Sequence, residues 1–141
     1  MLKSEIVREQ SPLPIPALGT KRQVLVIEDN KTVRKAVSRR LVSLGYRVTL
    51  ASSGYEGGIL FLTRSFDLAI IDVDAPQMKV WQLSRIFKEH SPTTPVIVAN
   101  GFTDEKHREE GGKSCVDAII PKPVKLNDVE WTVWRLLTSG A

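Results

Sequence analysis

Three short apolar runs most constrain what this chain can fold into. They are Val24–Ile27, Leu68–Ile71 and Val96–Ala99, and none of them contains a polar residue. A strand that is covered on both faces has this pattern, because neither row of its side chains meets water. The runs therefore predict central strands of a parallel sheet, with helices on both sides.

Segments of helical periodicity lie between and after these runs. Helices are expected over residues 33–44, closed by Gly45, and over Gly54–Thr63. A further helix is predicted over Trp81–His90, with Leu83, Ile86 and Phe87 facing inward. A last helix has its apolar face formed by Leu126, Val129, Val133, Leu136 and Leu137. A fourth helix is expected over Thr103–Lys113, but its first eight residues are all polar, which predicts a short or loosely packed element.

The remaining strands indicate the order of the sheet. Tyr46–Ala51 alternates apolar and polar residues, as an edge strand does, and Ala118–Ile120 is a short last strand. The fold class is therefore α/β: a flavodoxin-like (βα)5 sandwich with a five-stranded parallel sheet in the order 2-1-3-4-5. Residues 1–20, with three prolines in the stretch SPLPIPALGT, are expected to be a tail or linker before a domain over residues 21–141.

Charge and hydropathy exclude some classes of function. The net charge of +4 invites nucleic-acid binding, but the basic residues are spread out with no aromatic residues among them, so that interpretation is disfavoured. No apolar run approaches the roughly 20 residues of a membrane span. The chain is expected to be cytoplasmic.

Polar side chains arrive together at the carboxyl ends of the strands. Glu28 and Asp29 follow the first strand, Asp72 the third and Asn100 the fourth, while Lys122 follows the fifth. Ligands bind at this edge of an open parallel sheet. Three carboxylates in one place repel each other, and a divalent cation with oxygen ligands, such as Mg²⁺, relieves that repulsion. A carboxylate is also able to act as a nucleophile toward a phosphoryl group.

The segments VLVIEDN, LAIIDVDAP, PVIVANG and AIIPKPV resemble the signature segments of two-component response-regulator receiver domains, over about residues 22–138. The resemblance implies that Asp72 is the phosphoacceptor, that Glu28 and Asp29 hold Mg²⁺ (or Mn²⁺), and that the backbone carbonyl of Asp74 completes the metal shell. Lys122 would contact the phosphoryl group, with a cis peptide bond to Pro123. The implied donor is a histidine kinase or a histidine phosphotransfer domain, and the chain would be a regulatory domain rather than an enzyme.

Three residues depart from the family pattern. Asn100 stands where the family usually has Thr or Ser, Ile119 where it usually has an aromatic residue, and Val80 where it usually has Gly. An Asn amide also donates hydrogen bonds, but it is larger than a hydroxyl and places its donor differently. We therefore expect phosphorylation of Asp72 with an atypical conformational switch.

Trp131 is expected to point away from the core, nearly opposite Val133 on the helical wheel. The resemblance makes the last helix a dimerisation face, so Trp131 is a candidate interface residue for a homodimer. The other interpretations are coverage by the N-terminal tail and single exposure.

Two other functions stay open. Asp72 and Asp74 also resemble the nucleophile motif of haloacid-dehalogenase-type phosphatases, but that motif usually follows the first strand of a larger domain. A receiver-like docking module that works without phosphorylation is the second. The substitutions at Asn100 and Ile119 favour this module, and the complete acid set with Lys122 opposes it.

Overall fold

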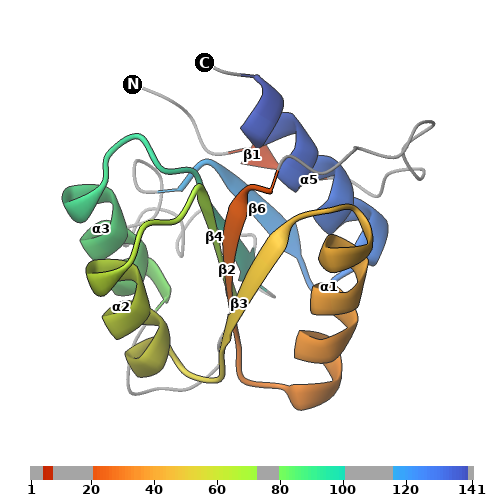
Figure 1. Cartoon of the computed structure of the whole chain (residues 1–141), viewed down its shortest axis with the longest axis horizontal. Helices are drawn as coiled ribbons and strands as arrows, with labels where there is room; N and C mark the ends of the chain where they lie inside the picture. Colours follow the sequence, from red (N-terminus) through yellow and green to blue (C-terminus); the bar gives the residue numbers. More distant parts are fainter. Residues whose placement is uncertain (1–4, 8–20, 73–79, 101–115, 140–141) are drawn as a thin grey trace.

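A parallel sheet of six strands runs through the centre of the fold, with α1 and α5 on one face and α2 and α3 on the other (Figure 1). This computed structural model describes residues 5–7, 21–72, 80–100 and 116–139. The strands are β1 (Glu5–Ile6), β2 (Gln23–Glu28), β3 (Arg47–Ala51), β4 (Leu68–Asp72), β5 (Val96–Asn100) and β6 (Ala118–Pro121). The helices are α1 (Lys31–Ser43), α2 (Gly54–Thr63), α3 (Val80–His90) and α5 (Leu126–Thr138).

The strand order is β1-β6-β5-β4-β2-β3. Without β1 this is the predicted flavodoxin-like order 2-1-3-4-5, which is confirmed. The alternating strand β3 lies at one edge, and the three fully apolar runs lie in the interior strands β2, β4 and β5. Because an interior strand is covered on both faces, only such runs are stable there.

The structure differs from the expected tail at residues 5–7. Glu5 and Ile6 pair with Ala118 and Ile119 of β6 in parallel register. The Val7 amide donates to the Ile119 carbonyl at 2.7 Å, and Val7 is 5% exposed. This pairing satisfies backbone groups of β6 that an open sheet edge would leave exposed.

Two apolar layers hold the helices on the sheet. Inward-facing residues of β2 alternate between them: Leu25 and Ile27 face α2 and α3, whereas Val24 and Val26 face α1 and α5. Helix α1 begins where the Asn30 side chain accepts from the Val33 amide at 3.0 Å. It is followed by Gly45, whose φ of 96° is left-handed, as the sequence predicts for a helix C-terminus.

Helix α2 approaches the sheet closely at one glycine. A Cβ atom on Gly57 would overlap the Ile27 side chain of β2, so only glycine fits at this distance. Phe61, one turn further on, stacks on Phe87 of α3 with ring centroids 3.9 Å apart. The glycine that weakens α2 as a helix is therefore required by its packing.

One residue of helix α3 differs from the sequence prediction, in which it is expected to face inward. Leu83 and Phe87 are buried as expected, but Ile86 is 40% exposed. The helix packs on β4 and β5 and against α2, and these contacts leave Ile86 partly exposed. Helical spacing alone does not show how wide the buried face of a helix is.

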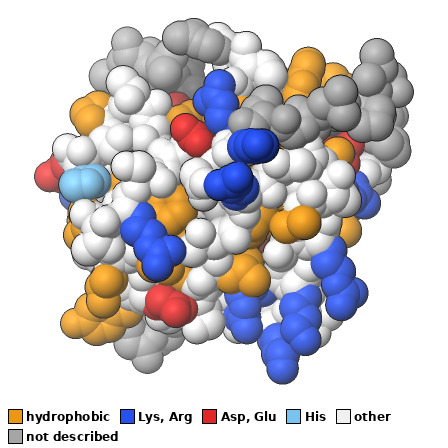
Figure 2. Space-filling view, in the orientation of Figure 1, with side chains coloured by type: hydrophobic (Ala, Val, Ile, Leu, Met, Phe, Trp, Pro, Cys, Tyr) orange, Lys and Arg blue, Asp and Glu red, His pale blue; other side chains and the backbone are white. Residues whose placement is uncertain are grey.

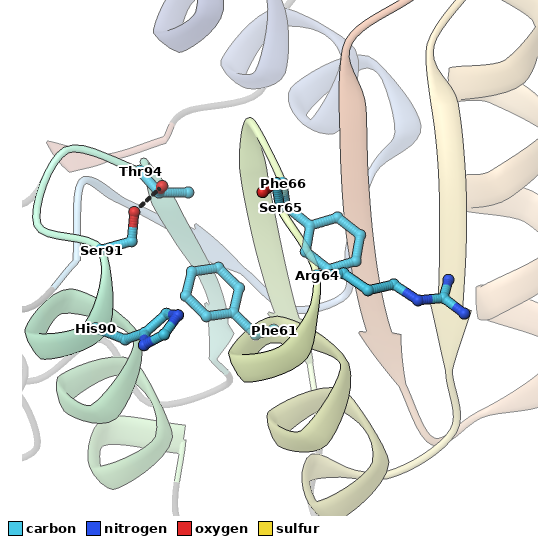
Figure 3. A pocket seen from close by; sticks show the side chains of 7 residues that line it. All are labelled: Phe61, Arg64, Ser65, Phe66, His90, Ser91 and Thr94. Carbon is cyan, nitrogen blue, oxygen red and sulfur yellow. Dashed lines mark hydrogen bonds between the residues drawn. The ribbon is translucent and has the colours of Figure 1, made fainter.

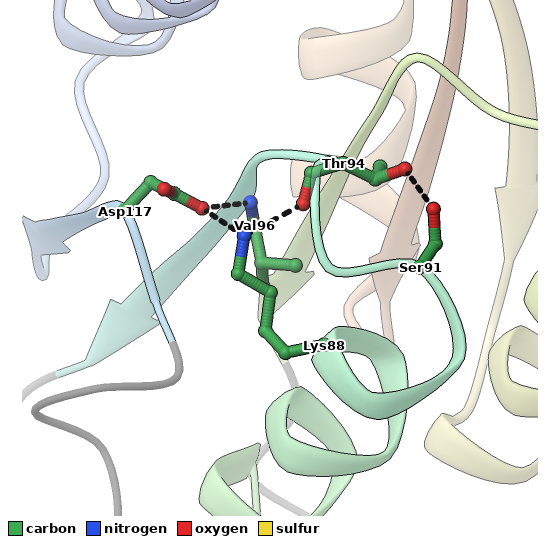
Figure 4. A network of polar contacts seen from close by, with 5 residues as sticks. All are labelled: Lys88, Ser91, Thr94, Val96 and Asp117. Atoms are coloured by element: carbon green, nitrogen blue, oxygen red, sulfur yellow. Dashed lines mark hydrogen bonds and ion pairs between the residues drawn. The ribbon is translucent and has the colours of Figure 1, made fainter. Parts of the chain in front are cut away.

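A polar network fixes the end of α3 to the starts of β5 and β6 (Figure 4). Lys88 Nζ donates to the Thr94 carbonyl and to Asp117 Oδ2, both at 2.9 Å. The same Asp117 oxygen accepts from the Val96 amide at 2.8 Å. The network lies at the amino ends of these strands, away from the carboxyl ends where the acidic residues gather.

The helix expected over Thr103–Lys113 and the residue Asp74 lie outside the described residues. Among the helices that are described, none is long and apolar enough to cross a membrane.

Candidate functional site

Two buried carboxylates lie side by side at the carboxyl ends of β2 and β4. Glu28 and Asp72 are partners in the parallel register of these strands, so their backbones end at the same level. Glu28 is 3% exposed and Asp72 is 6% exposed. Two acidic side chains in one buried place create a strong demand for positive charge or protons.

The pKa of Glu28 reflects the burial of the two acidic side chains. Burial, followed by the hydrogen bond to Asp72, raises the pKa of Glu28 from 4.5 to about 9. The negative charge of Asp72 and a contact with Asp29 raise this pKa further, while the Asn30 amide lowers it. At neutral pH, Glu28 therefore holds a proton that a cation at this position would displace.

Lys122 provides one positive charge beside Asp72. Its Nζ atom lies 2.6 Å from Asp72 Oδ1, and both side chains are largely buried. The contact is an ion pair, and within the described part of the chain Asp72 Oδ1 has no hydrogen-bond partner besides it. A buried carboxylate oxygen without a hydrogen bond is unusual, because its desolvation is costly. Here the positive charge of Lys122 offsets that cost.

The loop after β2 holds Glu28 in position. The Asn30 amide donates to Glu28 Oε2 at 3.0 Å, and Arg34 Nη1 of α1 donates to the Glu28 carbonyl at 2.8 Å. Asp29 is exposed on the solvent side of the pair. The sequence interpretation missed Asn30 and Arg34 as positioning residues. Asn30 had a local signal, since an Asn directly before a periodic segment is a preferred N-cap.

The structure places the other predicted site residues as follows. The peptide bond from Lys122 to Pro123 is cis, as the resemblance implied. Asn100 ends β5, and its backbone lies level with Pro121 of β6, but its side chain is outside the described residues. Ile119 is 1% exposed within the apolar layer on the α2 and α3 side.

The acidic residues do not form a complete metal cage by themselves. Among the described residues, no three His, Cys, Asp or Glu side chains are arranged to hold a metal ion on their own. Glu28 nevertheless contacts both Asp72 and Asp29. A cation at this place would therefore need further oxygen ligands from outside these three side chains.

Two hollows lined by described residues lie elsewhere, toward the amino ends of the strands. A pocket of about 190 Å³ is lined by Phe61, Arg64, Ser65, Phe66, His90, Ser91 and Thr94. In Figure 3 the Arg64 side chain extends away from His90, and the hydroxyls of Ser91 and Thr94 bond each other at 2.6 Å. A shallower groove lies over the starts of β2 and β5 beside the end of α5. Neither hollow is lined by a nucleophile with a partner base, so the carboxyl ends remain the candidate site.

Trp131, the candidate interface residue, is half-buried on α5. Its ring meets Trp134 edge to face, with centroids 5.5 Å apart and an angle of 89°. The two rings cover each other in part, so Trp131 is less available than a singly exposed aromatic residue. A homodimer through the last helix stays a prediction.

The doubly wound sheet, with an acidic pair and a lysine at its carboxyl ends, defines an open α/β domain whose candidate site lies beyond the strand ends. A family model for the response regulator receiver domain matches residues 24–133. The chain therefore belongs to the response regulator receiver domain family of two-component systems.

Similar proteins agree with this assignment. The transcriptional regulatory protein CusR of Escherichia coli K12 is 27% identical over 84% of this chain and 52% of its own length. The sensor histidine kinase RcsC of Escherichia coli K12 is 31% identical over 78% of this chain and 12% of its own. The signal receiver domain of a histidine kinase from Syntrophus aciditrophicus has a TM-score of 0.75 and 28% identity, and covers 84% of this chain and 91% of its own. The chain thus spans about half the length of CusR.

Proposed function

We propose that Asp72 accepts a phosphoryl group from a histidine kinase or a histidine phosphotransfer domain, in a reaction that depends on Mg²⁺ or Mn²⁺. One observation carries the proposal: Asp72 is buried beside Glu28, with Lys122 Nζ 2.6 Å from an Asp72 oxygen that has no hydrogen bond in the described part of the chain. A carboxylate is able to act as a nucleophile toward a phosphoryl group, and positive charge close by stabilises the charge on the transferring oxygens.

The donor set fits a hard divalent cation. Glu28, Asp29 and Asp72 would supply carboxylate oxygens, and the Asp74 carbonyl would add a backbone ligand. Mg²⁺ usually binds through one or two carboxylates and fills its shell with waters and phosphate oxygens, so an incomplete protein cage suits it. When bound, the ion neutralises charge on the phosphoryl oxygens. The raised pKa of Glu28 supports this fit, since a cation would take the place of its proton.

The transfer itself needs little from the protein beyond position and charge. An Asp72 carboxylate oxygen forms a bond to phosphorus while the phosphorus–nitrogen bond of the donor phosphohistidine breaks. The electron pair of that bond stays on the imidazole nitrogen, and the ring, which carries a proton on its other nitrogen, leaves as neutral imidazole. Lys122, which already contacts Asp72, would then pair with an oxygen of the new phosphoryl group. The product is a phosphoaspartate, and the domain acts as a regulated acceptor rather than as a multiple-turnover enzyme.

The response to phosphorylation would differ from the usual switch of the family. Ile119 stands at the position of the usual aromatic residue and is 1% exposed in the apolar layer. An aliphatic side chain held there has no polar tip that swings between a buried and an exposed position. Together with Asn100 in place of Thr or Ser, this supports a changed conformational output.

A direct labelling experiment tests the proposal. The wild-type chain is incubated with acetyl phosphate and Mg²⁺, and intact-mass measurement follows the gain of one phosphoryl group. We expect labelling of the wild type and none for Asp72→Asn. Asp67→Asn is a matched control. In the wild type Asp67 Oδ2 accepts a hydrogen bond from the Gln23 amide at 2.7 Å, and the amide oxygen of the variant is still able to accept it. A wild type that stays unlabelled, or an Asp72→Asn variant that is labelled equally, would refute the proposal.

Two other outcomes would point to the alternative functions. An unlabelled domain that still binds a histidine kinase would support a docking module that works without phosphorylation. Continued release of phosphate from a phosphate monoester, over many turnovers, would support a phosphatase that uses Asp72 and Asp74.

A further inference from the structure

An apolar surface on α2 and α3 has no partner within the described part of the chain. It consists of Tyr55, Ile59 and Leu62 of α2 with Ile86 of α3, and we call it the α2 surface. Their exposed fractions are 74%, 58%, 45% and 40%, respectively. Figure 2 shows hydrophobic side chains gathered over α2, at the lower left of the view.

The four residues form one continuous patch. Tyr55, Ile59 and Leu62 are spaced by four and three residues, so they lie on one side of α2. A Cβ atom on Gly58 would lie 3.6 Å from Leu83 of α3, so the two helices touch at that level. Leu62 follows Gly58 by four residues and Ile86 follows Leu83 by three, so helical spacing places Leu62 and Ile86 at a similar level of the two helices.

Helix α2 has the composition of a helix that is covered on all sides. It has no charged residue between Glu56 and Arg64. Glu56 itself is used at the helix start, where its Oε1 accepts from the Ser52 amide at 2.6 Å, and its own amide donates to Ser53 Oγ at 3.1 Å. A helix that is apolar all round is normally buried, so the outer side of α2 is expected to contact another protein surface.

We propose that the α2 surface is where two copies of this chain associate. The charges near it favour a second copy: Glu56 lies in the first turn of α2 and Arg64 at its C-terminal end, and Arg85 and Glu89 lie close to Ile86 in the sequence of α3, all four exposed. In an antiparallel two-fold pairing centred on Ile59, the acidic end of one α2 faces the basic end of the other. A border with two charges of each sign is thus complementary to its own copy.

Helix α1, on the opposite side of the molecule, has a different distribution of charges. Helix α1 carries Lys31, Arg34, Lys35, Arg39 and Arg40 and no acidic residue. Figure 2 shows a group of Lys and Arg side chains at the lower right, over α1. Two such surfaces would repel each other, so α1 does not suit a pairing of identical copies.

The size of the patch determines how tightly two copies are expected to associate. From their exposed fractions, the four side chains present roughly 400 Å² of surface, which matches the largest apolar patch of a typical monomer and is often functional. Two such patches bury less than the ~1,200 Å² at which stable interfaces begin, even with a polar border added. The proposed dimer is therefore weak and reversible, with a dissociation constant in the micromolar to millimolar range.

Sedimentation velocity on the whole chain, from about 10 µM to about 1 mM, tests this proposal. We expect the weight-average sedimentation coefficient of the wild type to rise with concentration. Ile59→Lys should raise the dissociation constant more than about tenfold, since the lysine enters a two-fold interface twice. Val42→Lys is the matched control: Val42 is 53% exposed on α1, and its replacement should leave the dissociation constant unchanged.

A second variant guards against a general effect of added charge. Arg64→Glu keeps the apolar patch but places two acidic residues opposite each other, so dimerisation should weaken in low salt and recover in part in high salt. Thermal unfolding of each variant confirms that it is folded. A wild type that is monomeric at every concentration would overturn the proposal. A dimer that persists in Ile59→Lys and dissociates in Trp131→Ala would also overturn the proposal, because that dimer would form through the last helix.

Discussion

The protonation of Glu28 leads to a quantitative prediction about stability. Its pKa is about 9 in the folded domain against an ordinary value of 4.5. Because the folded state binds this proton more tightly than the unfolded state, the contribution is fully present below pH 4.5 and is lost as the pH rises toward 9. Each pH unit in that window costs about 1.4 kcal/mol.

At pH 7 the loss amounts to roughly 3 kcal/mol, because two and a half pH units separate 4.5 from 7. Glu28→Gln removes this cost, since a neutral amide needs no proton, and its oxygen is still able to accept from the Asn30 amide. We therefore expect the metal-free variant to be more stable than the metal-free wild type at pH 7 to 8, and equally stable near pH 4.5.

Urea unfolding between pH 5 and pH 8, in the presence of a chelator, measures this difference. Glu89→Gln is the control, because it also removes one carboxylate, but from the exposed side of α3. Adding Mg²⁺ should stabilise the wild type more at pH 8 than at pH 6, because the ion competes with the Glu28 proton, and it should stabilise Glu28→Gln much less. If the difference between Glu28→Gln and the wild type does not change with pH, the reasoning about the buried acid pair is wrong.

Two further predictions concern packing and the polar network. Gly57→Ala should destabilise the domain by about 1–3 kcal/mol, because its methyl group overlaps Ile27, whereas Gly58→Ala has room for a methyl group and should stabilise the helix by up to about 1 kcal/mol. Urea unfolding of the pair measures both, and equal effects of the two alanines would contradict the close approach of α2 to β2. Asp117→Leu should cost about 2–4 kcal/mol, because it leaves Lys88 and the Val96 amide without the oxygen that both contact. The double variant Asp117→Leu with Lys88→Met should recover part of that loss in the same assay, and an additive loss would refute the coupling.

Much of the fold followed from local patterns. The three apolar runs identified three of the four interior strands, and the alternation of Tyr46–Ala51 identified an edge. Helix α2 has the predicted bounds, and α1 ends before the glycine that the sequence indicated. Such features are predictable because burial on one or both faces determines the residue type at each position of a strand or helix. The position of Glu28 and Asp72 directly after two of these strands likewise placed both acids at one edge of the sheet.

Other features depended on residues that are far apart in the sequence. Residues 5–7 have no strand pattern of their own, and they join the sheet only because β6 offers an open edge. Ile86 fits the helical spacing, yet the width of the contact that α3 makes with β5 and α2 leaves it partly exposed. The need for glycine at position 57 arises from Ile27, thirty positions earlier in the sequence. A local sequence pattern does not predict how closely these two residues approach each other in space.

The candidate site divides in the same way. The sequence by itself determined which side chains reach the carboxyl ends of the strands, since strand length and polarity fix where each apolar run stops. Only the tertiary structure decided that Glu28 and Asp72 share one level of the sheet and that Lys122 lies 2.6 Å from an Asp72 oxygen. The pKa of Glu28 follows from this arrangement, because burial and the distance between charges are properties of the packed chain and not of any single segment.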